Sequence, residues 1–325
     1  MTPTKKEDRF SQLSRDAIQA FDDVSGLHPG FRPTHAKGIL LSGEFTPAAA
    51  GANITRAPHL HRAATPVSVR LSDFGGMPAI PDNHPDASPR GFALRFHLAE
   101  HTHTDIIAHS VNGFPTRTAE EFVELLRAIY ASASGATKPS PVELFLGSHP
   151  AALRFVQAPK PLPVSFATES FFAVSAYRFT DTDGVSRFGR YRIEPVAGGD
   201  YLSQEAAAGV PANFLFDEIK DRISKQPVEF SIRLQLAAAG DVVDDATVQW
   251  PEDRPQIDFG TVRLHAIVPD NDAQQRHIIF DPIPRVEGID PSGDPLLEPR
   301  AAVYLMSGRR RRANGGGSGE AVANH

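Results

Sequence analysis

The sequence predicts an α+β fold in which an antiparallel β-barrel carries added helices. Stretches that alternate apolar and polar residues, or that are rich in β-branched and aromatic residues, recur at broad spacing through the chain. Helical periodicity is confined to a few segments, and no internal repeat is visible. Strands spaced in this way, with helices inserted between them, favour one antiparallel barrel with helical additions.

The predicted strands are short and are separated by turn-forming residues. They cover residues 67–72, 92–98, 104–109, 171–179, 186–193, 228–236 and 259–268. The stretch 75–89 is rich in Pro, Gly and Asp, which predicts a loop. Asp183 and Gly184 stand between two predicted strands and indicate a hairpin turn.

Four segments have the composition and apolar spacing of helices. They cover residues 5–24, 119–131, 213–224 and 298–311. Thr118 precedes the second segment and is a suitable N-cap, and acidic residues occupy its first turn, where the helix dipole stabilises them. We expect the first segment to be a helix or an arm packed on a neighbouring element.

Length and composition exclude several classes of function. With 325 residues the chain can hold one large domain or two ordinary ones. A formal net charge of -6 argues against nucleic acid as a main partner. The sequence contains no run of about eighteen apolar residues, the length that would predict a membrane-spanning helix. No apolar stretch follows the basic N-terminal residues, so we expect a cytoplasmic protein, with the periplasm as the alternative. The absence of cysteine excludes disulfides and thiolate ligands.

Two distant segments carry the chemistry, Arg32-Pro-Thr-His35-Ala-Lys-Gly38 and Arg300-Ala-Ala-Val-Tyr304. On a helix, Arg300 and Tyr304 share a face, and a guanidinium beside a phenol favours the phenolate. Arg311 lies seven residues after Tyr304 and returns to the same face. Taken alone, each residue would be an ordinary structural one. The pairing of the two segments resembles the haem catalases, whose axial ligand is a tyrosine.

The resemblance covers residues 26–312, because further segments match in the same order. They are Val69-Arg-Leu-Ser72, Ser88-Pro-Arg-Gly-Phe-Ala93, Asp105-Ile-Ile-Ala-His109, Phe280-Asp-Pro282 and Gly288-Ile-Asp-Pro-Ser292. The resemblance implies an eight-stranded antiparallel barrel with helical additions. It also implies an N-terminal arm or helix over 1–25, a single haem-binding domain over 26–312 and a flexible tail over 313–325.

The resemblance assigns a role to each site residue. Tyr304 would be the axial ligand of the iron of haem b, with Arg300 beside it, and Arg32, Arg70 and Arg311 would neutralise the haem propionates. Phe114 and Phe122 would line the haem and its access channel. His35 would transfer the peroxide proton, which is work for a residue near the unperturbed histidine pKa, and Ser72 would fix its tautomer.

Three features depart from the pattern of ordinary catalases. His109 stands where the family has a distal asparagine that helps to hold peroxide. Thr34 stands where ordinary catalases have valine, and threonine there also occurs in catalase-related allene oxide synthases. The chain stops just after the tyrosine helix, so we expect it to lack the C-terminal helical and flavodoxin-like regions of large catalases. Together these features resemble the small catalase-related peroxidases.

The leading hypothesis is a haem peroxidase that reduces organic hydroperoxides, hydrogen peroxide or both, with weak catalase activity. The alternatives are a haem-dependent hydroperoxide isomerase or lyase, which Thr34 and the changed pocket motivate, and a non-enzymatic haem-binding protein. We expect a small-molecule peroxide and an electron donor as partners, a homo-oligomer (dimer or tetramer), and no nucleic acid or membrane partner.

Two histidine pairs invite a metal site, His59-x-His61 and His101-x-His103, because alternate strand residues share a face. No carboxylate stands at a suitable spacing. We therefore interpret these histidines as surface residues or as hydrogen-bonding residues of loops. The basic run 309–312 is interpreted as a solvated helix end, except for Arg311.

Overall fold

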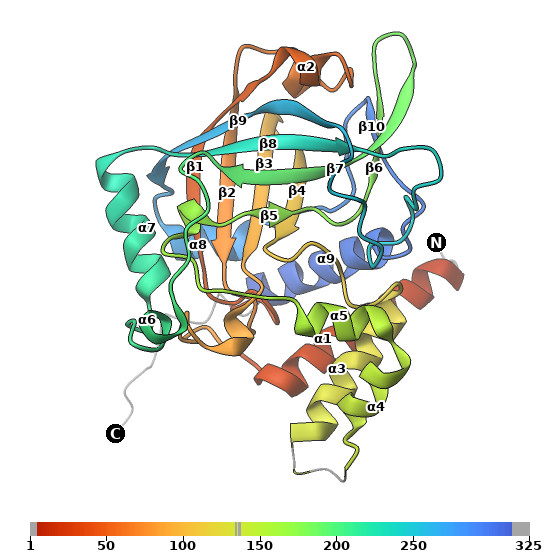
Figure 1. The fold of residues 1–325 in the computed structure, drawn as a ribbon, viewed down its shortest axis with the longest axis vertical. Helices are drawn as coiled ribbons and strands as arrows, with labels where there is room; N and C mark the ends of the chain where they lie inside the picture. Colours follow the sequence, from red (N-terminus) through yellow and green to blue (C-terminus); the bar gives the residue numbers. More distant parts are fainter. Residues whose placement is uncertain (1–4, 134, 136–137, 314–325) are drawn as a thin grey trace, which may run out of the picture.

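A closed antiparallel barrel forms the centre of the molecule (Figure 1). The computed structural model describes residues 5–133, 135 and 138–313. The strands in this part are β1 (Gly38–Pro47), β2 (Thr65–Ser72), β3 (Gly91–Ala99), β4 (Thr102–His109), β5 (Phe171–Phe172), β6 (Tyr177–Thr180), β7 (Ser186–Pro195), β8 (Val228–Leu236), β9 (Gln256–Ile267) and β10 (Ile289–Pro291). All pairings between them are antiparallel.

The ring closes because β7 pairs with β5 on one edge and with β8 on the other. Following the pairs from β7 gives the order β7, β5, β4, β3, β2, β1, β9 and β8, which returns to β7. That ring contains eight strands, and β6 and β10 extend from β7 outside it. The predicted fold class, an eight-stranded antiparallel barrel with helices, is confirmed.

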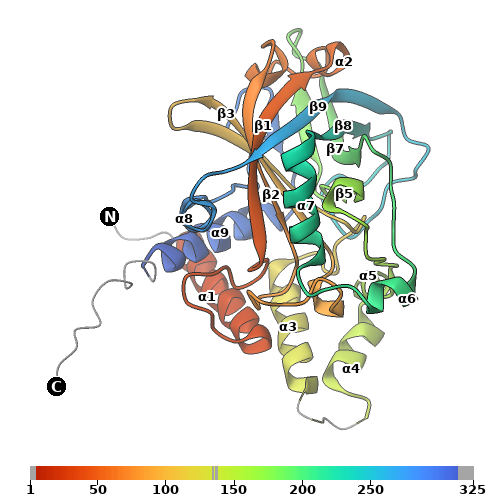
Figure 2. The same cartoon turned by 90° about the vertical axis from the view of Figure 1, so that its left-hand side faces the viewer.

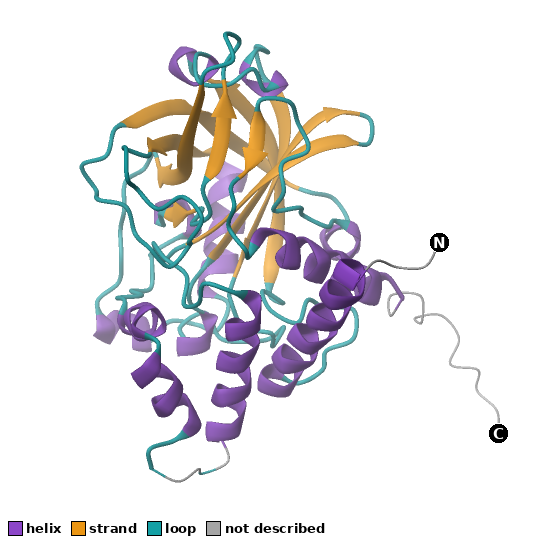
Figure 3. Cartoon of the chain, turned by 90° about the vertical axis from the view of Figure 1, so that its right-hand side faces the viewer, coloured by secondary structure: helices purple, strands orange, loops and turns teal. Residues whose placement is uncertain are grey.

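The helices gather mainly at one end of the barrel (Figures 2 and 3). They are α1 (Lys5–Ser25), α2 (Ala49–Ala52), α3 (Ala119–Ala133), α4 (Pro141–Ser148), α5 (Pro150–Gln157), α6 (Gln204–Ala208), α7 (Phe214–Lys225), α8 (Asn271–His277) and α9 (Leu297–Ala313), with 3-10 turns at Pro58–Leu60, Pro85–Ala87 and Phe166–Thr168. The first helix packs against α3 and α9 through Leu13, Ala17 and Phe21. No helix in the described part of the chain is long and apolar enough to cross a membrane.

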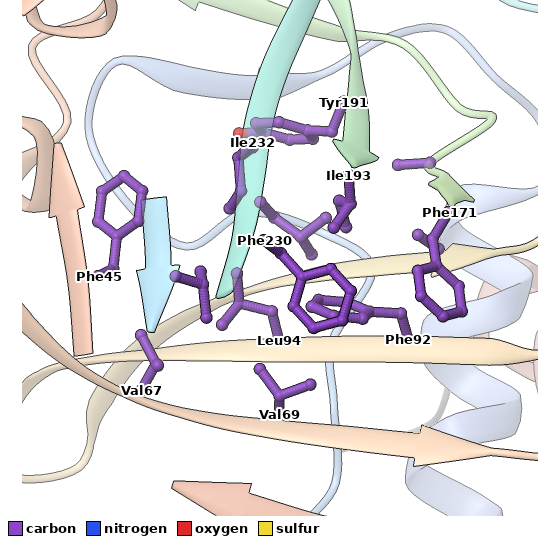
Figure 4. Packing of buried hydrophobic residues seen from close by; sticks show 14 of the residues in the cluster. Phe45, Val67, Val69, Phe92, Leu94, Phe171, Tyr191, Ile193, Phe230 and Ile232 are labelled. Atoms are coloured by element: carbon purple, nitrogen blue, oxygen red, sulfur yellow. The ribbon is translucent and has the colours of Figure 1, made fainter. Parts of the chain in front are cut away.

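Aromatic and aliphatic side chains fill the inside of the barrel. Phe92, Phe171 and Phe230 come from three different strands, and the Phe92 ring lies 5.1 Å from each of the other two ring centroids (Figure 4). Phe45 and Phe96 continue this packing, with their ring centroids 5.0 Å apart. Because side chains occupy the interior, a ligand site has to lie at an end of the barrel.

The predicted strand 171–179 is wrong as a single strand. Phe172 pairs with Arg192 and Tyr177 pairs with Gly189. The advance of five residues from β5 to β6 therefore corresponds to only three residues along β7. Two extra residues therefore lie between β5 and β6, and the pairing is interrupted there although both strands follow β7. Of the predicted tail 313–325, Ala313 is the last residue of α9 and the other residues lie outside the described ones.

The interpretation of His59 as a surface or loop residue is wrong. Its side chain is fully buried, its ring centroid lies 4.4 Å from that of Phe96, and neither ring nitrogen has a hydrogen-bond partner. Burial, followed by the positive charge of Arg62, lowers the pKa of His59 to about 3. His61 fits the interpretation, since its Nε2 lies 2.9 Å from the carbonyl oxygen of Thr55. Among the described residues no cluster of three or more metal-binding side chains exists.

We expect His59→Leu to stabilise the protein. Leucine of similar volume removes two buried, unpaired nitrogens, which should add about 1–3 kcal/mol to the free energy of unfolding at pH 7. The pKa of His59 is lower in the folded than in the unfolded chain, so stability falls as the pH drops below about 6.5, and the variant should lose less. Urea unfolding at pH 7 and pH 5 measures both effects. His101→Asn, at an exposed loop position, is the control; a less stable His59→Leu protein would contradict the prediction.

Candidate functional site

A cavity of about 230 Å³ lies where one end of the barrel meets α1, α3, α5 and α9. All the site residues predicted from the sequence line this one cavity. They are Arg32, Thr34, His35, Arg70, Ser72, His109, Phe114, Phe122, Arg300, Tyr304 and Arg311. The fold therefore brings together residues from the first hundred positions and residues from the last helix.

The segment before β1 holds His35 in a constrained position. Its backbone has a φ of 55°, in the left-handed region that few residues other than glycine adopt. The backbone N–H donates to the Phe74 carbonyl at 2.6 Å, and the ring packs edge-on against Phe74 with centroids 5.4 Å apart. Nδ1 lies 3.0 Å from Ser72 Oγ. Burial, with the charge of Arg70 next, lowers the pKa of His35 to about 3, so its imidazole is neutral at pH 7.

A glycine makes room for this histidine and for Ser72. Gly91 pairs with Ser72 across β2 and β3, and with His109 across β3 and β4. A Cβ at Gly91 would lie 2.5 Å from Ser72 Oγ and 2.8 Å from His35 Nδ1, closer than side chains approach. The strand pairing thus places the serine, the glycine and the second histidine in one row under the cavity.

His109 presents an unpaired nitrogen in the same cavity. The Val111 backbone N–H donates to His109 Nδ1 at 3.3 Å, and the buried Nε2 has no hydrogen-bond partner in the part of the chain that the structure describes. Burial, and then the charge of Arg300, lowers the pKa of His109 to about 3. A neutral imidazole that accepts at Nδ1 carries its proton on Nε2. His109 therefore offers an N–H donor of fixed tautomer.

The Thr34 hydroxyl is already committed to the backbone. Its Oγ1 donates to the Phe74 carbonyl oxygen at 2.7 Å. The same carbonyl accepts the His35 backbone N–H, so Thr34 helps to hold the unusual turn at His35. Its hydroxyl proton is consequently not available to a ligand in the cavity.

On α9, Arg300 and Tyr304 form the pair expected from their spacing. Arg300 Nη2 donates to Tyr304 Oη at 3.3 Å, and the guanidinium carbon lies 5.8 Å from the centre of the phenol ring. Burial acts to lower the pKa of Arg300, but the oxygens of Tyr304 and Tyr177 outweigh burial and the pKa is raised. A guanidinium that stays charged beside a phenol oxygen stabilises the phenolate, the form that binds ferric iron.

Three arginines, the buried Arg70 and Arg311 and the partly buried Arg32, converge on the cavity without a carboxylate partner among the described residues. Arg32, Arg70 and Arg311 donate only to backbone carbonyls, one amide and one hydroxyl. Burial, followed by repulsion from neighbouring arginines, lowers the pKa of Arg70 to about 9 and that of Arg311 to about 10. The Nε of Arg311 is buried and unpaired. Buried cations require an anion, so this cluster fits a ligand with more than one carboxylate, as haem has.

Aromatic rings form much of the cavity wall. Phe114 and Phe122 line it as predicted, with ring centroids 5.2 Å apart, and Phe21, Phe74 and Phe155 add to the same wall. The flat, apolar walls and the polar groups at the edges suit a large planar ligand such as a porphyrin.

Sequence reasoning missed several residues that shape the site. Gln275 bonds two of the arginines, Phe155 brings α5 to the cavity wall, and the buried Asp294 accepts the Leu296 backbone N–H just before α9. The signal for Asp294 was present, because an Asp before an apolar run is a common helix start. Gly91 stood in a matched segment but was given no role. Gln275 has no comparable signal in its own neighbourhood.

Comparison with known proteins gives consistent matches. The model of the family described as Catalase matches residues 27–316. A protein named catalase-related peroxidase from Mycolicibacterium paratuberculosis is 34% identical, over 91% of this chain and 93% of its own length. Another of that name from Synechococcus elongatus is 30% identical, over 90% of this chain and 87% of its own. The structure of a fungal catalase superposes with a TM-score of 0.77 at 20% identity and covers 86% of this chain; the match spans 59% of the fungal chain.

Proposed function

The chain belongs to the catalase family, and on this basis we propose that it is a haem-dependent peroxidase that reduces organic hydroperoxides and hydrogen peroxide, with weak catalase activity. It is an oxidoreductase that acts on peroxide and takes electrons from a small-molecule donor. One observation carries the proposal: a Tyr–Arg pair, a neutral histidine and three arginines without an anion share a single cavity.

In this proposal Tyr304 holds the iron of haem b, and Arg32, Arg70 and Arg311 hold its propionates. Arg300 donates to the Tyr304 oxygen at 3.3 Å and would hold that oxygen in position toward the iron. Phe114 and Phe122 flank the porphyrin and exclude water from it. The haem would supply the redox-active iron at which the peroxide O–O bond is cleaved.

The proton of the peroxide is moved by His35. Its neutral imidazole accepts the proton from one peroxide oxygen and returns it to the other, which then leaves as water or as an alcohol. The Ser72 hydroxyl, 3.0 Å from Nδ1, fixes the orientation of the ring and directs the other nitrogen to substrate. Electrons from the outside donor complete the reduction.

His109 holds the substrate but does not compete for its proton. The Nε2–H would donate to a peroxide oxygen. The Nδ1 lone pair already accepts the Val111 N–H, so the neutral ring has no free lone pair with which to take a proton. An imidazole is bulkier than the asparagine amide of ordinary catalases, so a second hydrogen peroxide is held less well. Oxidation of an outside donor is favoured over oxygen evolution as a result.

The apolar wall supports organic hydroperoxides as substrates. Phenylalanine, alanine, valine and proline make up more than half of the lining residues, and α1, α3, α5 and α9 contribute part of them. Contact with such side chains stabilises an alkyl or aryl group when it leaves water. Hydrogen peroxide gains nothing from these contacts.

We expect His109→Asn to raise oxygen evolution relative to dye oxidation, because the smaller amide leaves room for a second hydrogen peroxide. Both activities are measured in one haem-loaded preparation, with and without a reductant, for hydrogen peroxide and cumene hydroperoxide. Oxygen evolution by the unmodified protein at the rate of an ordinary catalase would overturn the peroxidase assignment. Conversion of hydroperoxide without any reductant would identify an isomerase or lyase instead. His103→Asn, on β4 outside the cavity lining, serves as the control.

A further inference from the structure

Gln275, near the end of α8, connects two arginines of the cavity. Its Oε1 accepts from Arg70 Nε at 2.8 Å, and its backbone carbonyl accepts from Arg32 Nη1 at 3.1 Å. Its Nε2 donates to the Gly38 carbonyl at 3.0 Å and to Asn271 Oδ1 at 2.8 Å. Both amide hydrogens are used, so the oxygen can only face Arg70. Its side chain is thus fixed, buried and outside the roles assigned above.

The third arginine is tied to the same segment. The Ile278 carbonyl accepts from Arg32 Nη2 at 3.2 Å and from Arg311 Nη2 at 3.0 Å. We call the Gln275 side chain, together with the carbonyls of Gln275 and Ile278, the arginine bracket. It gives all three guanidiniums a fixed position with neutral acceptors only.

Arginines in the described part of the chain take either kind of acceptor: the buried Arg192 donates to the amides of Asn112 and Gln235, whereas other arginines pair with carboxylates. Arg95 makes two bonds to the buried carboxylate of Asp105, at 2.9 and 2.7 Å, and Arg90 pairs with the buried Asp73. A carboxylate would satisfy Arg70 equally well and would offset the burial and the repulsion from Arg311 that lower its pKa. It would also neutralise the charge that an anionic ligand needs. The arginine bracket therefore positions the arginines without neutralising their positive charge.

We propose that Gln275 is a positioning residue for cofactor binding: it aligns Arg70 and Arg32 for the carboxylates of the porphyrin and, being neutral, keeps those carboxylates from facing a competing anion. This inference rests on the proposed function, since it takes a porphyrin dicarboxylate as the ligand of the three arginines. It predicts that the identity of residue 275 sets the preference for porphyrin carboxylates, and not the affinity for the porphyrin ring.

The test compares two iron-free ligands, protoporphyrin IX and its dimethyl ester, in which the carboxylates are blocked. Their fluorescence gives the two dissociation constants without iron, peroxide or turnover. The unmodified protein should prefer the free acid. Gln275→Glu should lower that preference by about tenfold or more, the scale seen when partners of ligand-holding groups are changed, with ester affinity preserved. Gln235→Glu is the matched control, because Gln235 accepts from the buried Arg192 outside the cavity; its preference should not change.

A second variant guards against misfolding of the first. Gln275→Met keeps the charge and approximate length but removes the acceptor for Arg70, so the preference for the free acid should again fall. Equal loss of affinity for acid and ester in both variants would show that Gln275 is only structural, and an unchanged preference would overturn the inference as well. The proposed function is judged separately, by whether iron protoporphyrin binds with a tyrosinate spectrum.

Discussion

Tyr304→Phe is expected to lose haem or to bind it with a different spectrum. The unmodified protein, produced with a haem precursor, should show a high-spin ferric spectrum with a tyrosinate charge-transfer band. Phenylalanine fits the same space but has no oxygen for the iron, and it leaves Arg300 without the phenol that it contacts at 3.3 Å. Retention should fall at least as far as the roughly 10–100-fold typical of changes around metal ligands.

The haem-to-protein ratio after gel filtration and the rate of haem transfer to excess apomyoglobin measure this loss. Tyr201→Phe is the control, because that phenol bonds Glu169 away from the cavity. A Tyr304→Phe protein with an unchanged spectrum would remove Tyr304 from the iron and with it the proposed cofactor site.

His35→Ala is expected to keep its haem and to react with peroxide about 10²–10⁴-fold more slowly, the usual contribution of general acid–base catalysis. Stopped-flow absorption after mixing with hydrogen peroxide gives the rate. Since the pKa of His35 lies near 3, the rate in the unmodified protein should be flat from about pH 5 to pH 9. It should fall only toward pH 3, where the imidazole gains a proton and can no longer accept one.

Two further variants test whether the slower reaction with peroxide comes from loss of the His35 imidazole. Ser72→Ala keeps the base but frees its ring, so a smaller loss is expected. His103→Ala, on β4 outside the cavity lining, should react at the unmodified rate. A normal rate in His35→Ala would assign the proton transfer to another group, and His109 is the other histidine that lines the cavity.

Alternating burial helped to reveal β8, which was predicted over its full length. It is not required, since β2 and β7 were predicted although four and five of their residues are buried in succession. β1 was not predicted: Ile39, Leu40 and Leu41 are buried in succession at its start, although burial alternates from Leu41 to Thr46. Its neighbours explain this burial: β2 and β9 flank it, and Asn271 bonds the Leu40 backbone from α8. The burial of residues in β1 therefore depends on the elements that pack against it.

The helices α4 and α5 were also missed, although the start of α4 carries a local signal. Ser140 and Glu143 form a capping box ahead of an apolar run, which is a known helix start. Phe155 on α5 reaches the cavity only because that helix folds back against the end of the barrel. Motifs located the residues predicted for the site, which line one cavity, whereas its walls and Gln275 depend on contacts between segments far apart in the chain.

From the shared Ile278 carbonyl we expect the site to form late in folding. It accepts from Arg32 and Arg311, two side chains separated by 279 positions in the sequence. Contacts of such long range form slowly, because a very large loop must close before they stabilise anything. A partly folded chain, even one with an intact barrel, cannot place these two cations on one oxygen. We therefore expect the Soret absorption of bound haem to appear slowly when the protein refolds, and the rate of its appearance measures the last step of folding.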